Sequence, residues 1–264
     1  MKTFFIKLFK MTQSMFTLQM TYRIGIWIWM LNGLLPLVTM FVWMNIANDN
    51  PINGRTSSDF INYFLAVIVV GQLMASPILS RLDSDIRYGY MSNKLLLPIN
   101  PYWSYVSEKI SITFFTIPFL VIPIAIVYFF LGLDWKMDLF NVSLFFISLI
   151  GSIILQFHRQ FSMGLISFWS DKTLATSRVW ESLNYILSGA FAPIDMFPLY
   201  LQKIILLSPF PYVIYFPVAI LNGNLSNSEV FLGFFIQYSW VIIFVFLYRL
   251  LWYRGLKRYG AVGA

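Results

Sequence analysis

The chain has 264 residues and a net charge of +7; 59% of its residues are hydrophobic and 11% are charged. Soluble domains carry roughly 25% charged residues, so a soluble fold is excluded and the apolar side chains must face lipid. The absence of cysteine excludes disulfides and thiolate metal sites. The basic residues are distributed in a way that indicates membrane orientation and not nucleic-acid binding.

Residues 1–22 predict an amphipathic helix that lies in the inner membrane interface. Phe4, Phe5 and Leu8 recur at helical spacing with lysines between them, and such helices bind at the level of the lipid headgroups. The interrupting lysines and the lack of a small-residue cleavage site argue against a signal peptide. An ordinary cytosolic extension of the first span is the alternative that this pattern leaves open.

Six membrane spans are predicted, since a bilayer core requires about 20 apolar residues per helix. Five are continuous apolar segments, at 24–46, 59–80, 106–131, 140–169 and 230–250. The remaining span, at about 175–193, is weaker because charged and amide side chains occupy its first half. Pro36, Pro77, Pro118 and Pro123 lie within spans and should kink them. The expected fold is all-α and integral to the membrane, a single membrane domain over 1–264 with no soluble domain attached.

The distribution of basic residues predicts that both termini are cytoplasmic. With six spans and the N-terminus inside, Arg55, Lys136 and Lys203 fall outside, and the other 15 of the 18 Lys and Arg residues fall inside. This agrees with the positive-inside rule, whereas five spans would put the basic C-terminal end outside. The expected location is a bacterial cell membrane, with the chain as a multi-pass protein.

No catalytic site is expected within the chain. The G-x-x-x-x-G-K-[ST] phosphate loop, the G-x-S-x-G turn and the H-E-x-x-H pair are missing from the sequence, which has a single histidine. An intramembrane enzyme is therefore disfavoured. Neither a metal site nor a cofactor is expected in this chain.

A polar group interrupts the apolar run of the fourth span, at His158, Arg159 and Gln160. A charge at mid-membrane costs roughly 2.5–3.5 kcal/mol on insertion scales, so such residues usually line a cavity or find a partner. Glu181 and Asn184 on the next span are the natural partners, and Arg159 and Glu181 are predicted to lie close enough to pair. An alternative of equal weight is that the helix has reached the cytosolic interface at Arg159, since 20 residues rise about 30 Å.

The segment 81–105, which we name the coupling segment, is the longest predicted cytosolic connection. Gly89 indicates a break, after which S-N-K-L-L-L-P predicts a short helix. Ser92 or Asn93 is the expected N-cap, and Pro98 is the expected stop. A short helix between two spans suits docking of a cytosolic partner, and a solvated turn resting on headgroups is the alternative.

Residues 191–224, which we name the outer segment, are apolar but broken by proline. The prolines in this part of the chain are Pro193, Pro198, Pro209, Pro211 and Pro217. One continuous helix cannot carry them, because each interior proline removes a hydrogen bond and clashes with the preceding turn. In lipid the freed backbone groups need partners from protein or water. Short broken helices that re-enter the outer leaflet are therefore predicted.

Three motifs carry a resemblance to a known family. They are D-I-R-Y-G-Y-M-S-N-K-L-L-L-P at 85–98, S-G-A-F-A-P-I-D-M-F-P at 188–198 and the ending G-L-K-R-Y-G-A-V-G-A at 255–264. In order and spacing, the chain resembles the ABC-2 type of ABC-transporter permease, most closely the six-span permeases encoded apart from their ATPase. The motif at 85–98 is similar to that family's coupling segment, and the motif at 188–198 is similar to its re-entrant region.

The resemblance implies a permease subunit of an ATP-driven exporter that moves an amphipathic or hydrophobic drug, peptide, lipid or glycan out of the cytoplasm. Its partners would be cytosolic ABC ATPases, which bind ATP and Mg²⁺, and a second identical or related permease that completes a dimer in the bilayer. The positions matching the coupling motif are Asp85, Arg87, Gly89, Leu95, Leu97 and Pro98. The positions matching the outer gate are Ser188, Gly189, Pro193, Pro198, Pro209 and Pro217.

Two other functional classes stay open. An ion-coupled secondary transporter would use His158, Arg159 and Glu181 as a relay. Such carriers often contain internal repeats with paired broken helices, whereas the broken region occurs once in this sequence. A scaffold or immunity protein without transport activity is compatible with the composition.

Overall fold

A computed structural model of the chain describes residues 2–21, 34–131 and 138–260. The α-helices are α1 (Lys2–Thr21), α3 (Leu34–Asp49), α4 (Ser57–Met74), α5 (Ile78–Arg87), α6 (Tyr90–Leu95), α7 (Tyr102–Leu131), α8 (Leu139–Leu165), α9 (Thr173–Leu187), α10 (Leu199–Leu207), α11 (Tyr215–Leu221) and α12 (Asn227–Arg258). Two 3₁₀ turns, η2 (Ile166–Phe168) and η3 (Ile194–Met196), complete them. Within these described ranges the fold is all-α, as predicted.

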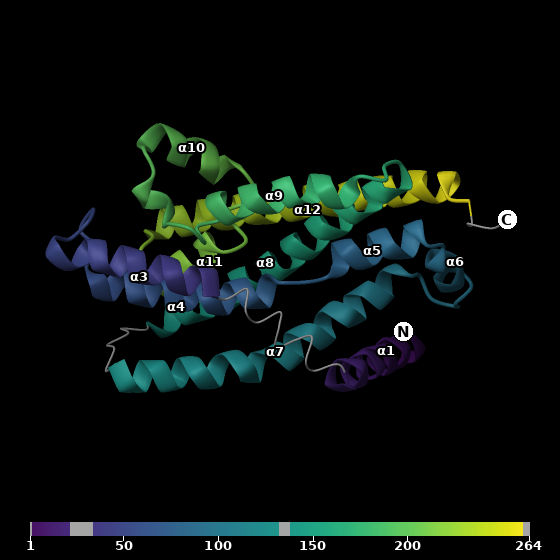
Figure 1. Ribbon diagram of the computed structural model, residues 1–264, viewed down its shortest axis with the longest axis horizontal. Coiled ribbons are helices and arrows are strands. Elements are labelled where there is room, and N and C mark those ends of the chain that lie inside the picture. Colours follow the sequence, from purple (N-terminus) through teal and green to yellow (C-terminus); the bar gives the residue numbers. More distant parts are fainter. Residues whose placement is uncertain (1, 22–33, 132–137, 261–264) are drawn as a thin grey trace.

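Three helical stretches are long and apolar enough to cross a bilayer, namely Ser57–Arg87, Leu139–Phe168 and Asn227–Arg258 in the described part of the chain. The helices run roughly along one long axis (Figure 1). α10 lies toward one end of this axis, and α6 and the C-terminus lie at the other. The full set of six spans stays a prediction.

Two predicted spans differ from the helices that the structure describes. The predicted span 24–46 lies partly outside the described residues, and its remainder belongs to α3. The predicted span 175–193 is occupied by α9, which ends at Leu187 after 15 residues. At 1.5 Å per residue, α9 is about 22 Å long, which is short of the ~30 Å hydrocarbon core.

The body of the molecule is built around α8 and α12, which pack along each other, with α11 and α5 against α8. Two glycines of α12, Gly233 and Gly255, let this helix approach its neighbours closely. A Cβ added at Gly233 would lie 2.1 Å from the Phe216 ring, and one at Gly255 would lie 2.1 Å from the Phe168 ring. These two positions let α12 contact α11 near one end and η2 near the other.

α1 is a helix, as predicted, and it packs along α7 (Figure 1). Phe4 contacts Trp103 edge-on at a centroid distance of 4.9 Å, and Phe16 contacts Phe115 at 6.0 Å. Phe9, between Phe4 and Phe16 in the helix, is 68% exposed. The contacts fix α1 to the start of α7, and its position in a membrane interface remains a prediction.

The helix predicted as the second span is broken at Pro77, as its sequence indicates. α4 ends at Met74, and α5 begins at Ile78, because proline lacks the N–H that the helix ladder requires. The break frees backbone carbonyls, and Lys109 of α7 caps them. Its Nζ donates to the carbonyl oxygens of Leu73 at 2.6 Å and of Ala75 at 2.9 Å.

Candidate functional site

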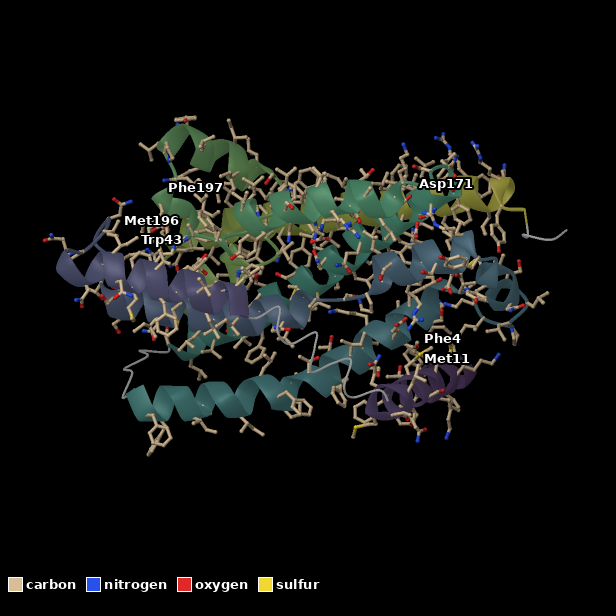
Figure 2. The ribbon with its side chains drawn as sticks, in the orientation of Figure 1. Phe4, Met11, Trp43, Asp171, Met196 and Phe197 are labelled. Atoms are coloured by element: carbon tan, nitrogen blue, oxygen red, sulfur yellow. The ribbon has the colours of Figure 1, made fainter. Side chains whose placement is uncertain are left out.

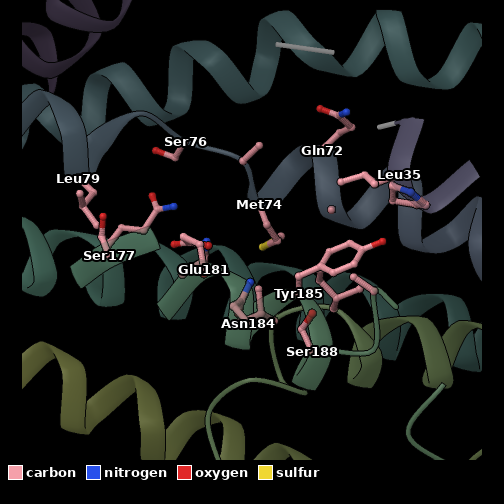
Figure 3. A pocket seen from close by; sticks show the side chains of 18 of the residues that line it. Leu35, Gln72, Met74, Ser76, Leu79, Ser177, Glu181, Asn184, Tyr185 and Ser188 are labelled. Atoms are coloured by element: carbon pink, nitrogen blue, oxygen red, sulfur yellow. The ribbon is translucent and has the colours of Figure 1, made fainter. Parts of the chain in front are cut away.

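The described residues line a partly open cavity of about 670 Å³ between α3, α4, α5, α8, α9, the connection after α9, and Val213 and Ile214 of the outer segment. Figure 3 shows Met74 and Ser76 facing Glu181 and Asn184 across it. Part of its lining is apolar, for example Leu35, Met74, Leu79, Val213 and Ile214. The rest is mostly amides and hydroxyls, together with Arg178 and Glu181. A space of this size lies within the usual range for small-molecule sites.

The pair predicted from the interrupted fourth span lies beside this cavity. Arg159 is fully buried, and its Nη2 lies 3.6 Å from Oε1 of Glu181, whose side chain is 42% exposed. The guanidinium also donates to Gln156 Oε1, from Nε at 3.0 Å and from Nη2 at 2.6 Å. Asn184 and Gln160, from the same polar group, line the cavity wall. The proximity of Arg159 and Glu181 expected from the sequence is therefore present.

His158 belongs to a different environment. Its Nε2 lies 3.1 Å from the Tyr102 hydroxyl, and its Nδ1 lies 2.8 Å from the Ile154 carbonyl oxygen. Its ring also contacts Tyr248 of α12 at a centroid distance of 5.2 Å. Consecutive residues of a helix project in different directions. The structure thus places His158 with aromatic residues of α7 and α12, and Arg159 with α9.

In the coupling segment, two of the predicted residues act as internal braces. Asp85 is buried, contacts Lys94 Nζ and accepts a hydrogen bond from the Tyr105 hydroxyl at 2.6 Å. Burial, and then the charge of Asp85, raise the pKa of Tyr105 well above its ordinary value, so the phenol stays protonated and donates. Arg87 pairs with buried Asp83 at 2.8 Å. The Asp85 contacts hold α6 against α5 and α7, whereas the Arg87–Asp83 pair lies within α5.

The prediction that Ser92 or Asn93 is the N-cap of the short helix in the coupling segment was wrong. α6 begins at Tyr90, ahead of Ser92 and Asn93, and its N-cap is Gly89 with φ +79°. Glycine adopts this left-handed conformation without a Cβ penalty, so the turn begins at the break itself. Ser92 instead hydrogen-bonds Tyr259 near the C-terminus at 3.0 Å.

α6 ends before the predicted stop. Its last residue is Leu95, and Pro98 follows in the turn leading to α7. Apolar and aromatic side chains on and around α6 are exposed, namely Tyr88, Tyr90, Leu95, Leu96 and Leu97. Leu96 is 84% exposed. This end of the molecule therefore presents an exposed apolar surface, and the contacts of Asp85 with Lys94 and Tyr105 hold it in place.

In the outer segment, the prolines stand at starts of helices and turns. Pro193 precedes η3, Pro198 precedes α10, and Pro217 lies in the first turn of α11, where a missing N–H costs little. Pro209 is buried between α10 and α11. The predicted pattern of short broken helices is present, and its depth in a membrane is a prediction.

Ser188 and Gly189 form the joint between α9 and the outer segment. The Ser188 carbonyl accepts from the Tyr215 N–H at 2.9 Å, and the Gly189 carbonyl accepts from the Tyr63 hydroxyl at 2.7 Å. Gly189 has φ +89°, and a Cβ there would lie 2.7 Å from the Tyr63 oxygen. The joint therefore requires glycine and ties the end of α9 to α4 and to α11 of the outer segment.

The outer segment is also fastened to the connection before α4, which no pattern in the sequence had indicated. Arg55 Nε lies 2.7 Å from Asp195 Oδ2, and Asn53 Nδ2 donates to the Asp195 carbonyl at 3.2 Å. Trp43 of α3 donates from Nε1 to the Phe191 carbonyl at 3.1 Å. Trp43 lies with Met196 and Phe197 at the end of the molecule opposite Asp171 (Figure 2).

The comparison with protein families agrees with this arrangement. Residues 28–263 match the family model described as ABC-2 family transporter protein. The chain belongs to the ABC-2 family of transporter proteins. A search of curated proteins finds no match for it.

Membership in the ABC-2 family makes the chain a membrane-embedded transport component, a permease of the ABC-transporter class, and not a catalytic subunit. The match covers the coupling segment, the cavity and the outer segment of this ABC-2 permease. Sequence reasoning missed Lys109 and Gln237, two buried polar residues that join helices. A lone glutamine within the apolar last span was a visible signal for Gln237, whereas Lys109 was counted among the cytoplasmic charges.

Proposed function

We propose that this ABC-2 permease is one half of an ATP-driven exporter in a bacterial cell membrane, with six spans and both termini in the cytoplasm. Separate ABC ATPases bind the coupling segment and hydrolyse ATP with Mg²⁺. A second identical or related permease completes the dimer. The cargo is an amphipathic or hydrophobic molecule that leaves the cytoplasm.

The observation that carries the proposal is the exposed apolar surface on the coupling segment. Tyr88 is 65% exposed and Leu96 is 84% exposed, although they lie at the end of the molecule that bears the basic C-terminus. Buried Asp85 holds the segment through Lys94 and Tyr105. Apolar patches on a polar surface mark interaction sites. Because the segment is held firmly against α5, a bound partner could transmit force to that helix.

The outer segment supports the outward direction. Its residues Val213 and Ile214 line one end of the cavity, next to Ser188 and Ala190 of the connection from α9. The Arg55–Asp195 pair fastens the outer segment to the connection before α4. Moving the outer segment away would connect the cavity with the outside, as the gate of an exporter requires. An ion relay receives less support, because His158 faces α7 and α12 and not Arg159 or Glu181.

The test is co-purification with a candidate ATPase, produced together with the permease. Tyr88→Asp should weaken the association at least about 30-fold, the scale of losing one aromatic hot spot worth ~2 kcal/mol, and should abolish permease-dependent ATP hydrolysis. Tyr253→Asp is the matched control, since Tyr253 is 62% exposed on α12 and should leave both properties unchanged.

Equal association of wild type and Tyr88→Asp would refute the proposal, as would equal loss in Tyr253→Asp. Leu96→Asp, at a still more exposed position, serves as a second variant if Tyr88→Asp does not fold. Its thermal unfolding should match that of wild type while its association is weakened.

A further inference from the structure

The C-terminal end of α12 carries a basic surface that neither the cavity nor the coupling segment uses. Four basic side chains lie within the last ten residues of the helix, and all are exposed: Arg249, Arg254, Lys257 and Arg258. None of them forms an ion pair with an acidic side chain among the described residues. Lys257 Nζ lies over the ring of exposed Tyr253, 4.2 Å from its centroid. We name these five residues the basic face.

The basic face occupies one side of the helix. Arg249, Tyr253 and Lys257 follow one another at a spacing of four residues, and Arg254 and Arg258 have the same spacing. Residues four apart are neighbours on a helix surface, so the five side chains form two adjacent rows.

The other side of this end of α12 is fixed to the rest of the protein. Tyr248 stacks on Tyr102 of α7 at a centroid distance of 5.1 Å, and Gly255 packs against the Phe168 ring. Just after the helix, the Tyr259 hydroxyl lies 3.0 Å from Ser92 Oγ of the coupling segment. These contacts hold the basic face in one orientation, directed away from the protein.

Acidic side chains at the same end of the molecule are engaged elsewhere. Asp83 and Asp171 both pair with Arg87, and Asp85 contacts Lys94. The positive charge of the basic face is therefore not compensated by these carboxylates, and an anionic partner would complement it.

The length of α12 places the basic face at the surface of a bilayer. The helix has 32 residues and is about 48 Å long, whereas the hydrocarbon core is about 30 Å thick. The predicted span 230–250 ends where the basic face begins. Side chains of a helix tilt toward its N-terminus, so those of the basic face point back toward the membrane. Tyrosine and tryptophan prefer this level, and Trp252 and Tyr253 lie there.

We propose that the basic face binds the headgroups of anionic phospholipids in the leaflet at this end of the protein. Clusters of four or more Lys and Arg residues just beyond a membrane span attract such lipids, and the guanidinium fork of arginine matches phosphate oxygens. An acidic protein surface has the same charge, but Arg249 lies within the predicted span, at the depth of the lipid. This inference does not depend on whether an ATPase binds the coupling segment.

The experiment titrates the purified full chain in dodecyl maltoside with single lipids and counts the bound lipids by native mass spectrometry. Phosphatidylglycerol is the anionic probe, and phosphatidylcholine with the same acyl chains is the probe without net charge. Inorganic phosphate at the same concentration as the lipid tests whether a free anion is sufficient.

Wild type should bind phosphatidylglycerol at least about tenfold more tightly than phosphatidylcholine. The double variant Arg254→Gln with Arg258→Gln should weaken phosphatidylglycerol binding about 5- to 25-fold, because each basic residue near an anionic surface contributes about fivefold. Its phosphatidylcholine binding should stay unchanged. Raising the salt concentration should reduce the preference of wild type for phosphatidylglycerol, since exposed charges are screened.

Two controls separate the basic face from charge in general. Arg254→Lys with Arg258→Lys keeps the charge and should retain binding within about threefold of wild type. Lys203→Gln removes an exposed basic residue of α10, toward the other end of the molecule (Figure 1), and should leave binding unchanged. Arg249→Gln with Lys257→Gln, from the other row, serves as a second variant if the first does not fold.

Equal affinity of wild type for the two lipids would overturn the inference, as would an equal loss of binding in Lys203→Gln. Displacement of phosphatidylglycerol by inorganic phosphate would overturn it too, because the site would then bind a free anion. If the double variants bind phosphatidylglycerol like wild type but lose a co-produced ATPase, the basic face contacts protein and the inference is wrong.

Discussion

Gln237 joins three parts of the protein at one buried point. Its side chain is fully buried in α12. Nε2 lies 3.1 Å from the Ser148 carbonyl, 3.0 Å from Ser152 Oγ and 3.0 Å from the Tyr212 carbonyl. We predict that Gln237→Leu, which keeps the approximate volume, destabilises the protein and loosens the outer segment from α8 and α12.

The size of the expected destabilisation follows from the number of hydrogen bonds that the Gln237 amide can donate. The amide has two N–H hydrogens, so the contacts around Nε2 amount to at most two full hydrogen bonds at any time. Hydrogen bonds between membrane helices average about 0.6 kcal/mol and reach about 1.7 kcal/mol. The Tyr212 carbonyl keeps a second donor, Ser152 Oγ at 2.8 Å. The expected loss is therefore about 1–2 kcal/mol, with the lower half of the range favoured.

The assay is reversible unfolding in mixed micelles, followed by tryptophan fluorescence, combined with hydrogen exchange. Ser239→Ala is the control, because Ser239 is only partly buried on the same helix and donates to the Phe235 carbonyl of that helix at 2.7 Å. Exchange should increase around Tyr212 in Gln237→Leu and not in the control. A double-mutant cycle with Ser152→Ala should give a coupling of about 0.5–1 kcal/mol.

Two results would refute this reasoning. An unfolding free energy within about 0.3 kcal/mol of wild type would mean that the buried amide contributes no net stability. A loss as large in Ser239→Ala would mean that the effect comes from the helix surface and not from the interhelical bonds.

Two further predictions follow from close contacts. Gly233→Ala should destabilise the fold by about 1–3 kcal/mol, the typical cost of overpacking, since its Cβ would lie 2.1 Å from Phe216. Gly71→Ala should be nearly neutral in the same unfolding assay, because its Cβ would lie 4.0 Å from Ile214 Cδ1. Equal losses of stability in the two variants would contradict the packing argument. Asp195→Asn should weaken the ion pair with Arg55 and raise the rate of proteolytic cleavage in the outer segment. The double variant Arg55→Asp with Asp195→Arg should restore protection from cleavage. An unchanged cleavage rate in Asp195→Asn would show that the ion pair does not hold the outer segment in place.

The breaks in the chain could be predicted from the sequence because they are local. Proline and Gly89 act within one or two residues of their own position, so the break between α4 and α5, the turn before α6 and the short helices of the outer segment agree with the sequence. Proline alone did not decide the outcome, because α7 continues as one helix through Pro118 and Pro123. The start of α6 was wrong by a few residues, since Ser92 bonds Tyr259, far away in the chain, and is not available as a cap.

The partners of buried polar groups were harder to predict. Arg159 and Glu181 could be paired because they lie on consecutive predicted helices and because an intramembrane charge needs a partner. The pairing of Arg55 with Asp195 depends on the path of the outer segment, which no periodicity encodes. Asp85 matched a docking motif, yet its carboxylate faces inward to Lys94 and Tyr105, so the motif located the coupling segment without showing which residues are exposed.

The position of the α4–α5 break connects the coupling segment with the cavity. α5 ends at the Gly89 turn, and the contact between Asp85 of α5 and Lys94 of α6 joins the two helices across it, so we expect a displacement of α6 to be passed to α5. The other end of α5 is at the break, where Ala75 and Ser76 line the cavity and Lys109 holds the freed carbonyls from α7. Without Lys109, bending at the break would leave these carbonyl oxygens without hydrogen-bond donors. The long side chain of Lys109 can move with the carbonyls and keep its hydrogen bonds to them. Under the proposed function, we therefore expect a force on the coupling segment to change the shape of the cavity wall before it reaches the outer segment.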